Sequence, residues 1–138
     1  MNELEDLIIL VPVYNDWASF QKLVEESDRA LRTIKQPFSI IAIDDCSVES
    51  PGPNIQKLNH LSQLKWLKVI HLFLNLGHQR AIAIGLAYVH DHYPDSSILV
   101  MDADGEDDPK DIISLIAACQ NNPQKIILAK RAHRSEGC

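Results

Sequence analysis

The chain has 138 residues, a length that fits one compact domain or part of a larger one. Because 46% of its residues are apolar, it can bury a sizeable core, and this composition excludes a disordered chain. The formal net charge is −6 and no run of Lys and Arg forms a basic stripe, which argues against nucleic acid as a partner.

Targeting signals are missing from the sequence. The first residues, MNELEDLIIL, are acidic before a short apolar run, which is the reverse of a secretory signal. No apolar stretch approaches the roughly 20 residues that span a bilayer. The three cysteines fit neither a metal-binding spacing nor an even-numbered disulfide framework, which favours a reducing compartment. We therefore expect a soluble, cytoplasmic chain without a membrane span.

The first half of the chain alternates apolar runs with an amphipathic stretch. Residues 7–13 predict a buried strand, and Asn15 or Asp16 is expected to cap the helix that follows. Apolar residues then recur at helical spacing over residues 17–34. A second strand is predicted at residues 38–43.

The second half continues this alternation. We predict a short helix, a strand, a helix of small residues, a strand, a helix and a fifth strand, over residues 55–64, 67–74, 77–92, 97–101, 109–119 and 126–129. Pro109 suits the first turn of its helix. Strands that are apolar on both faces and alternate with helices predict an α/β fold, with a mostly parallel sheet sandwiched by helices.

The carboxyl ends of the predicted strands carry most of the polar side chains. In such sheets, ligands bind where the chain leaves each strand for its helix. The polar residues at these ends are Tyr14, Asn15, Asp16, Asp44, Asp45, Ser47, Asn75, Asp102 and Asp104. Gathering at least four carboxylates at one edge is costly unless a cation lies among them.

Asp102, Ala103 and Asp104 follow the most hydrophobic predicted strand. Extended geometry sends alternate side chains the same way, so both carboxylates can face one point. Hard oxygen ligands of this kind suit Mg²⁺ or Mn²⁺. The alternative is an acidic loop that caps the next helix. We favour helix capping as the role of Asp107 and Asp108, and metal binding as the role of Asp104.

Asp44 and Asp45 end the second strand, where a carboxylate can accept hydrogen bonds from a base or ribose. An Asx turn that leaves the sheet is an equally good interpretation. The ring of Tyr14 can support a nucleobase, or it can be a partly buried side chain with a satisfied hydroxyl group. Both alternatives stay open for each of these residues.

Residues 75–80 open the small-residue helix, whose N-terminus presents free N–H groups and a partial positive charge. His78 and Arg80 add donors there, although we interpret His78 as a surface residue rather than a catalytic base. Ala81 and Gly85 are expected to allow close packing of the helix on the sheet.

Five segments together resemble the family 2 glycosyltransferases, especially the branch of dolichyl- and polyprenyl-phosphate sugar synthases. They are VPVYND (11–16), IDDCS (43–47), NLGHQRAIAIGLA (75–87), MDADGEDDP (101–109) and AKRAHR (129–134), and their order and spacing fit the family from end to end. Cys46 departs from the family, which usually has Gly there, and Glu106 stands where the family has Gln. The second change leaves the donor preference open.

The resemblance implies a GT-A fold that binds a UDP- or GDP-linked sugar. The residues implied in binding the nucleotide sugar are Pro12, Tyr14, Asp44, Asp45, Arg80, Asp102, Ala103, Asp104 and Arg131. Asp104 and Asp102 would bind Mg²⁺ or Mn²⁺, and Arg131 with Arg134 would face a phosphate. The implied enzyme is a metal-dependent, inverting glycosyltransferase of cell-envelope polysaccharide biosynthesis.

The family's catalytic domain continues well past residue 138. We therefore expect residues 1–138 to be the nucleotide-sugar-binding part, truncated on the C-terminal side. The acceptor site, for a polyprenyl phosphate or a glycan, and the catalytic base would lie outside this chain. The parent protein is expected at the cytoplasmic face of the membrane, in peripheral association with it.

Two other functions fit parts of the sequence. A phosphoacceptor receiver domain would use Asp44, Asp45, Asp102 and Lys130, but its acidic pair follows the first strand rather than the second, and it leaves residues 75–85 unexplained. A non-catalytic nucleotide-binding module would use the same site residues as the transferase.

Overall fold

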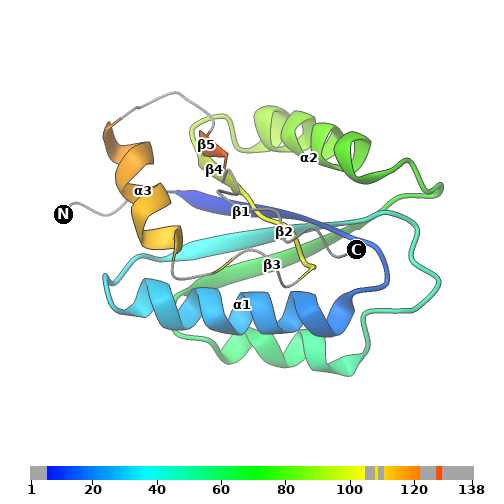
Figure 1. The fold of residues 1–138 in the computed structure, drawn as a ribbon, viewed down its shortest axis with the longest axis horizontal. Helices are drawn as coiled ribbons and strands as arrows, with labels where there is room; N and C mark the ends of the chain where they lie inside the picture. The colour runs from blue at the N-terminus through cyan, green and yellow to red at the C-terminus, as the bar shows by residue number, and fades with distance from the viewer. Residues whose placement is uncertain (1–5, 105–107, 109–110, 122–126, 129–138) are drawn as a thin grey trace, which may run out of the picture.

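The computed structural model describes residues 6–104, 108, 111–121 and 127–128, which form a five-stranded parallel sheet flanked by helices (Figure 1). In chain order the elements are β1 (Leu7–Val13), α1 (Trp17–Arg32), β2 (Phe38–Asp44), the 3₁₀ helix η1 (Pro53–His60), β3 (Leu64–His71), α2 (His78–His92), β4 (Ser97–Val100), α3 (Ile112–Asn121) and β5 (Ile127–Leu128). The strand order across the sheet is β3-β2-β1-β4-β5. The predicted α/β sandwich is confirmed.

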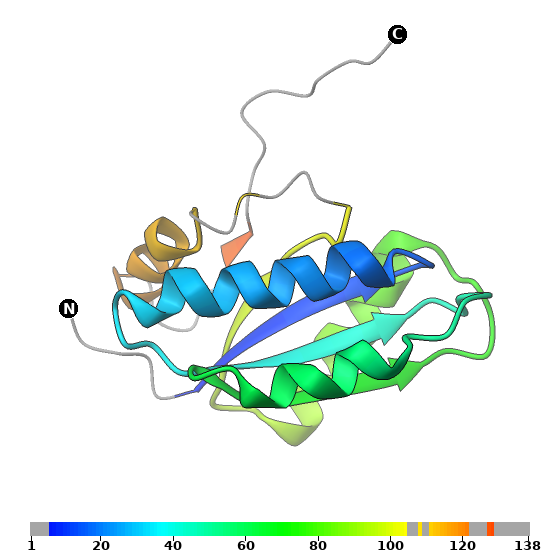
Figure 2. The same ribbon diagram turned by 90° about the horizontal axis from the view of Figure 1, so that it is seen from below.

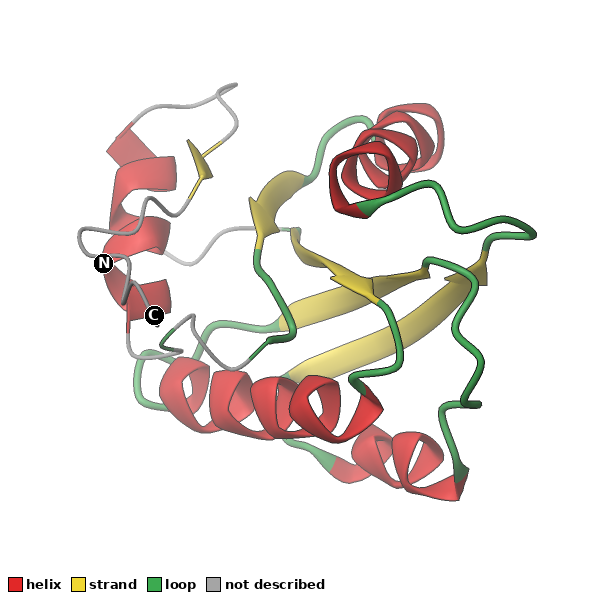
Figure 3. Ribbon diagram, turned by 45° about the vertical axis from the view of Figure 1, so that its right-hand side comes forward, coloured by secondary structure: helices red, strands yellow, loops and turns green. Residues whose placement is uncertain are grey.

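Helices cover both faces of the sheet, as the turned views show (Figures 2 and 3). On one face, α1, η1 and α3 pack against one set of alternating strand residues, including Ile9 of β1 and Ile40 of β2. On the other face, α2 packs against the intervening residues, including Leu10 and Ile41. Because successive side chains of a strand point to opposite faces, the fully buried β1 contributes to both cores.

Backbone hydrogen bonds extend the sheet beyond the strand ends. The Asp45 amide donates to the carbonyl of Val13 at 2.9 Å, and the Leu72 amide donates to the carbonyl of Asp44 at the same distance. The amide of Met101 donates to the carbonyl of Leu10 at 3.0 Å. These bonds fix where each loop leaves the carboxyl edge of the sheet.

The third strand begins earlier than its apolar run indicated, at Leu64 rather than Leu67, and it ends at His71 rather than Leu74. Pairing with β2 decides these limits, because the Phe38 amide bonds to the carbonyl of Gln63 and the ladder ends where β2 ends. Beyond it, Phe73 is 97% exposed. The prediction that residues 72–74 belong to the strand was therefore wrong.

Other boundaries also differ from the prediction. The short helix over 55–64 is the 3₁₀ helix η1, which starts at Pro53. Asp16 occupies the N-cap position of α1 without a capping hydrogen bond from its side chain. The side chain of Asn15, the other predicted cap, accepts the Val48 amide in the loop after β2. α3 begins at Ile112, and the predicted start at Pro109 lies outside the described residues.

Gly85 is the place where α2 approaches the sheet most closely. A Cβ atom added there would lie 2.5 Å from Cδ1 of Leu10 and 3.1 Å from Cγ1 of Ile43, and both of these side chains are fully buried. The predicted close packing is therefore confirmed for this residue, while Ala81 is buried on the same face of the helix.

Replacing this glycine tests the packing. We expect Gly85→Val to lower the free energy of unfolding by about 1–3 kcal/mol, because the packed core has no room for the added methyl groups. Urea unfolding followed by circular dichroism measures the change. Ala83→Val, at an exposed position of the same helix, is the matched control and should cost much less. Equal losses in the two variants would contradict the packing argument.

Candidate functional site

An open pocket of about 280 Å³ lies at the carboxyl edge of the sheet. It is lined by Pro12, Val13, Tyr14, Asp16, Asp45, Asn75, Gly77, His78, Asp102, Ala103 and Asp104. These residues come from the ends of β1, β2 and β4 and from the loop between β3 and α2. The predicted gathering of four carboxylates at this edge is confirmed, since Asp16, Asp45, Asp102 and Asp104 all line the pocket.

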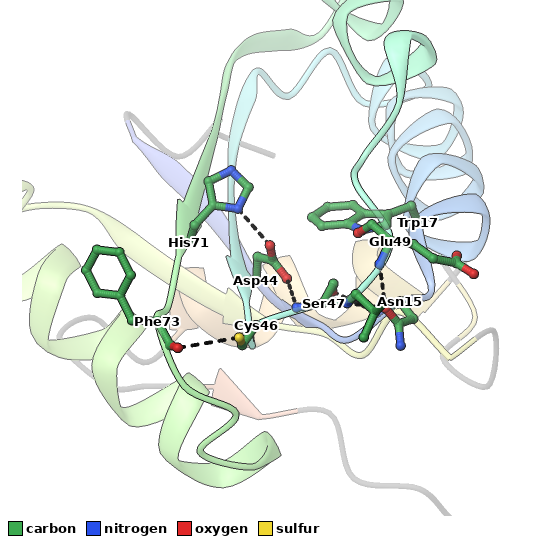
Figure 4. Close-up of polar contacts among 9 residues, drawn as sticks. Asn15, Trp17, Asp44, Cys46, Ser47, Glu49, His71 and Phe73 are labelled. Atoms are coloured by element: carbon green, nitrogen blue, oxygen red, sulfur yellow. Dashed lines mark hydrogen bonds and ion pairs between the residues drawn. The ribbon is translucent and has the colours of Figure 1, made fainter.

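Asp44 is buried and is not among the residues that line the pocket. Figure 4 shows its polar contacts. Its Oδ1 accepts a hydrogen bond from the Ser47 amide at 2.9 Å, and its Oδ2 lies 2.7 Å from Nδ1 of His71. The bond to Ser47 closes a turn of the kind that Asp commonly makes where a chain leaves a strand. The structure thus shows the turn that was one of the two interpretations of Asp44, and its contact with a base or ribose stays a prediction.

Asp45 lines the pocket and also holds the loop that leads to α2. Its two carboxylate oxygens accept the backbone amides of Leu76 at 2.7 Å and Gly77 at 2.9 Å. The side chain is only 4% exposed, so these hydrogen bonds are shielded from competing water. A single carboxylate just after β2 therefore holds the loop from which α2 starts.

Hydrogen bonds join the loop after β1 to the loop after β2 (Figure 4). The Asn15 amide donates to the hydroxyl of Ser47 at 2.8 Å, and Asn15 Oδ1 accepts the amides of Val48 at 2.8 Å and Glu49 at 3.1 Å. Asn15 has φ 62° and Cys46 has φ 60°. Cys46 thus occupies the left-handed region that favours Gly, the residue usual in the family motif.

The motif that follows β4 lies in the pocket, although the chain bends at residues 103–104 and does not continue the extended geometry of the prediction. Asp102 is partly buried, Ala103 is 5% exposed and Asp104 is exposed, and all three line the pocket. Nε2 of His78 makes a short contact with Oδ1 of Asp102. His78 is an exposed surface residue, as interpreted, yet it lines the pocket, and its link to Asp102 was missed because no sequence pattern joins two residues 24 positions apart.

The remaining predicted residues fall into three groups. Pro12, which is buried, and Tyr14, which is 47% exposed, both line the pocket. Arg80 is exposed on the first turn of α2 and is not among the pocket-lining residues. Arg131 and Arg134 lie outside the described residues. The binding roles assigned to all of these residues stay predictions.

A divalent cation is compatible with this donor set. Within the described ranges, no three His, Cys, Asp or Glu side chains are grouped so that they could hold a metal by themselves. Mg²⁺ at a nucleotide site, however, takes one or two carboxylates and completes its shell with phosphate oxygens and water. Asp102 and Asp104 on the wall of one pocket fit that requirement.

No helix in the described part of the chain is long and apolar enough to cross a membrane.

Removing the Asp45 carboxylate tests its hold on the loop. In Asp45→Ala two partly buried amides lose a charged acceptor, so we expect the free energy of unfolding to fall by about 1–3 kcal/mol. Hydrogen exchange at Leu76 and Gly77 should accelerate in the same variant. Asp95→Ala, at an exposed position near the opposite edge, is the control. Unchanged exchange at both amides would show that the carboxylate does not hold the loop.

Comparison with known proteins adds independent information. The sequence model of the family described as "Glycosyl transferase family 2" matches residues 8–138. A dodecaprenyl-phosphate galacturonate synthase of Rhizobium johnstonii is 27% identical over 132 residues, which cover 96% of this chain and 38% of that protein.

Two undecaprenyl-phosphate 4-deoxy-4-formamido-L-arabinose transferases are similarly related. The protein of Yersinia enterocolitica is 26% identical over 97% of this chain and 39% of its own length. The protein of Klebsiella pneumoniae is 28% identical over 79% of this chain and 32% of its own length. The chain therefore spans less than two fifths of each of these relatives.

Proposed function

The chain belongs to glycosyl transferase family 2, as its motifs indicated, and on that premise we propose that it forms the nucleotide-sugar-binding part of a glycosyltransferase. The observation that carries the proposal is the pocket at the carboxyl edge of the sheet. It combines an exposed aromatic ring, Tyr14, with four carboxylates and the N-terminus of a helix. An α/β sheet of this kind binds nucleotides at that edge.

The proposed donor lies with its base and ribose near Tyr14 and Asp45, at the ends of β1 and β2. Tyr14 offers a ring for stacking. Asp45 is the member of the acidic pair that reaches the pocket, whereas Asp44 accepts the amide of Ser47 in the loop after β2. The N-terminus of α2, where Gly77 and His78 line the pocket, adds a partial positive charge that favours an anionic group.

The diphosphate of the donor is proposed to lie near Asp102 and Asp104. Four carboxylates around one pocket would repel a diphosphate, and this favours a divalent cation between them. Asp104, with Asp102, would hold Mg²⁺ or Mn²⁺. When bound, such an ion neutralises the charge that develops on the leaving diphosphate.

The proposed reaction is an inverting displacement at the anomeric carbon of the donor. By their names, the relatives act on dodecaprenyl or undecaprenyl phosphate, and we propose a polyprenyl phosphate as the acceptor here too. A phosphate oxygen already carries the negative charge it needs to attack, so this acceptor requires no general base. The longer protein would then work at the cytoplasmic face of a membrane.

The alternatives make different use of the same residues. A receiver domain needs its acidic pair after the first strand, but Asp44 and Asp45 follow β2, and the family match favours the transferase. A non-catalytic nucleotide-binding module would share the whole pocket. Sugar transfer by a longer form that contains this chain, abolished by Asp104→Ala, would exclude the second alternative.

Nucleotide binding is the first test of the proposal. We expect one of UDP, GDP, CDP or dTDP to bind the chain in the presence of Mn²⁺ and to lose its affinity in EDTA, because the carboxylates then repel the diphosphate. Isothermal titration calorimetry measures both cases. Equal affinity with Mn²⁺ and with EDTA would contradict the proposed metal, and the absence of binding to all four would contradict the donor site.

The metal assignment has its own test. Asp104→Asn should abolish the Mn²⁺-dependent part of diphosphate binding and leave the thermal midpoint within about 2 °C of the parent chain, since the side chain is exposed. Asp108→Asn removes the same charge from the same loop at an exposed residue that does not line the pocket. The assignment fails if both variants bind the diphosphate like the parent.

A further inference from the structure

His78 joins two elements that are separated in the sequence and meet at the pocket. It is the first residue of α2, and its Nε2 contacts Oδ1 of Asp102 just after β4. Its neighbours Gln79 and Arg80, in the same turn, are exposed and do not line the pocket. His78 is therefore the side chain that connects the first turn of α2 to the acidic motif.

The start of α2 is itself held in place. Asp45, at the end of β2, accepts the amides of Leu76 and Gly77, the two residues that precede His78. Gly77 has φ 92°, a left-handed conformation that turns the chain into the helix. A polar connection thus runs from β2 through the loop before α2 to the end of β4, along the wall of the pocket.

Asp102 lies just beyond the last residue of β4, at the edge of the pocket. β4 ends at Val100, and the amide of Met101 still donates to the carbonyl of Leu10 in β1. The direction of an aspartate carboxylate is set by two side-chain torsions, and the contact with Nε2 of His78 restricts both of them for Asp102. Binding a diphosphate and its cation is favoured by a fixed direction for the carboxylate, and a hydrogen bond from a second side chain contributes to that direction.

We propose that His78 is a positioning residue of the donor site, which orients the Asp102 carboxylate for the nucleoside diphosphate and its divalent cation. This inference rests on the proposed function, because it assigns His78 to the same pocket. His78 acts through Asp102 and need not touch the donor. Its contribution should therefore disappear when Asp102 can no longer act as a carboxylate.

The first experiment compares three variants of the chain by calorimetry, with Mn²⁺ and the diphosphate that the parent binds best. We expect His78→Ala to weaken binding about tenfold, the equivalent of one good hydrogen bond to a charged group. His78→Gln keeps an N–H donor near the position of Nε2 and should stay within about threefold of the parent. Gln79→Ala, on the same turn, is the matched control and should bind like the parent.

A double-mutant cycle separates positioning from a general structural effect. If His78 acts through Asp102, the variant carrying both His78→Ala and Asp102→Asn should bind no more weakly than Asp102→Asn alone. Losses that simply add would overturn the positioning role. Thermal midpoints of all variants, measured in parallel, show whether any of them fails to fold.

The contact can also be measured without nucleotide. In ¹H–¹³C spectra of the histidine rings, assigned with His78→Gln, the His78 signals should shift in Asp102→Asn and stay in place in Asp104→Asn. No shift in Asp102→Asn would overturn the inference. If the parent binds none of the diphosphates, the proposed function and the positioning role fail together. If the parent binds and His78→Ala binds equally well, only the positioning role fails.

Discussion

The parallel pairing of the central strand β1 with β2 on one side and β4 on the other is the constraint on which the pocket depends. Parallel strands bring their carboxyl ends to one edge, so three loops that are far apart in the sequence must meet there. All seven residues of β1 are buried, and both cores are built on them. The pairing of apolar strands therefore determines where the polar residues of the pocket meet.

Burial divides the carboxylates of this edge into two kinds. Asp44 and Asp45 are almost fully buried, and protein donors engage both oxygens of each, so they shape the loops. Asp102 and Asp104 lie farther out along the pocket wall, where a cation and phosphate oxygens can reach them. The buried pair is engaged by donors of the protein itself, whereas the outer pair faces the pocket.

The family membership joins these observations to a chemistry. A nucleotide sugar presents a flat base, a ribose and a charged diphosphate, and the pocket presents a ring, carboxylates and a helix N-terminus in the same compact space. The relatives are much longer than this chain. The proposed polyprenyl-phosphate acceptor rests on the names of these longer relatives, whereas the proposed nucleotide-sugar donor rests on the residues of the pocket.

The sequence by itself determined the fold class and the edge that carries the site. Apolar runs such as residues 7–13 predict buried strands, and the residues that follow such strands lie together at one edge of a parallel sheet. The tertiary structure decided which of these residues contact one another. The limits of β3 follow from the length of β2, and the roles of Asn15, Asp44 and His78 follow from loops that meet across 24 to 34 positions. Such contacts depend on how whole helices and strands pack, so no short sequence pattern predicts them.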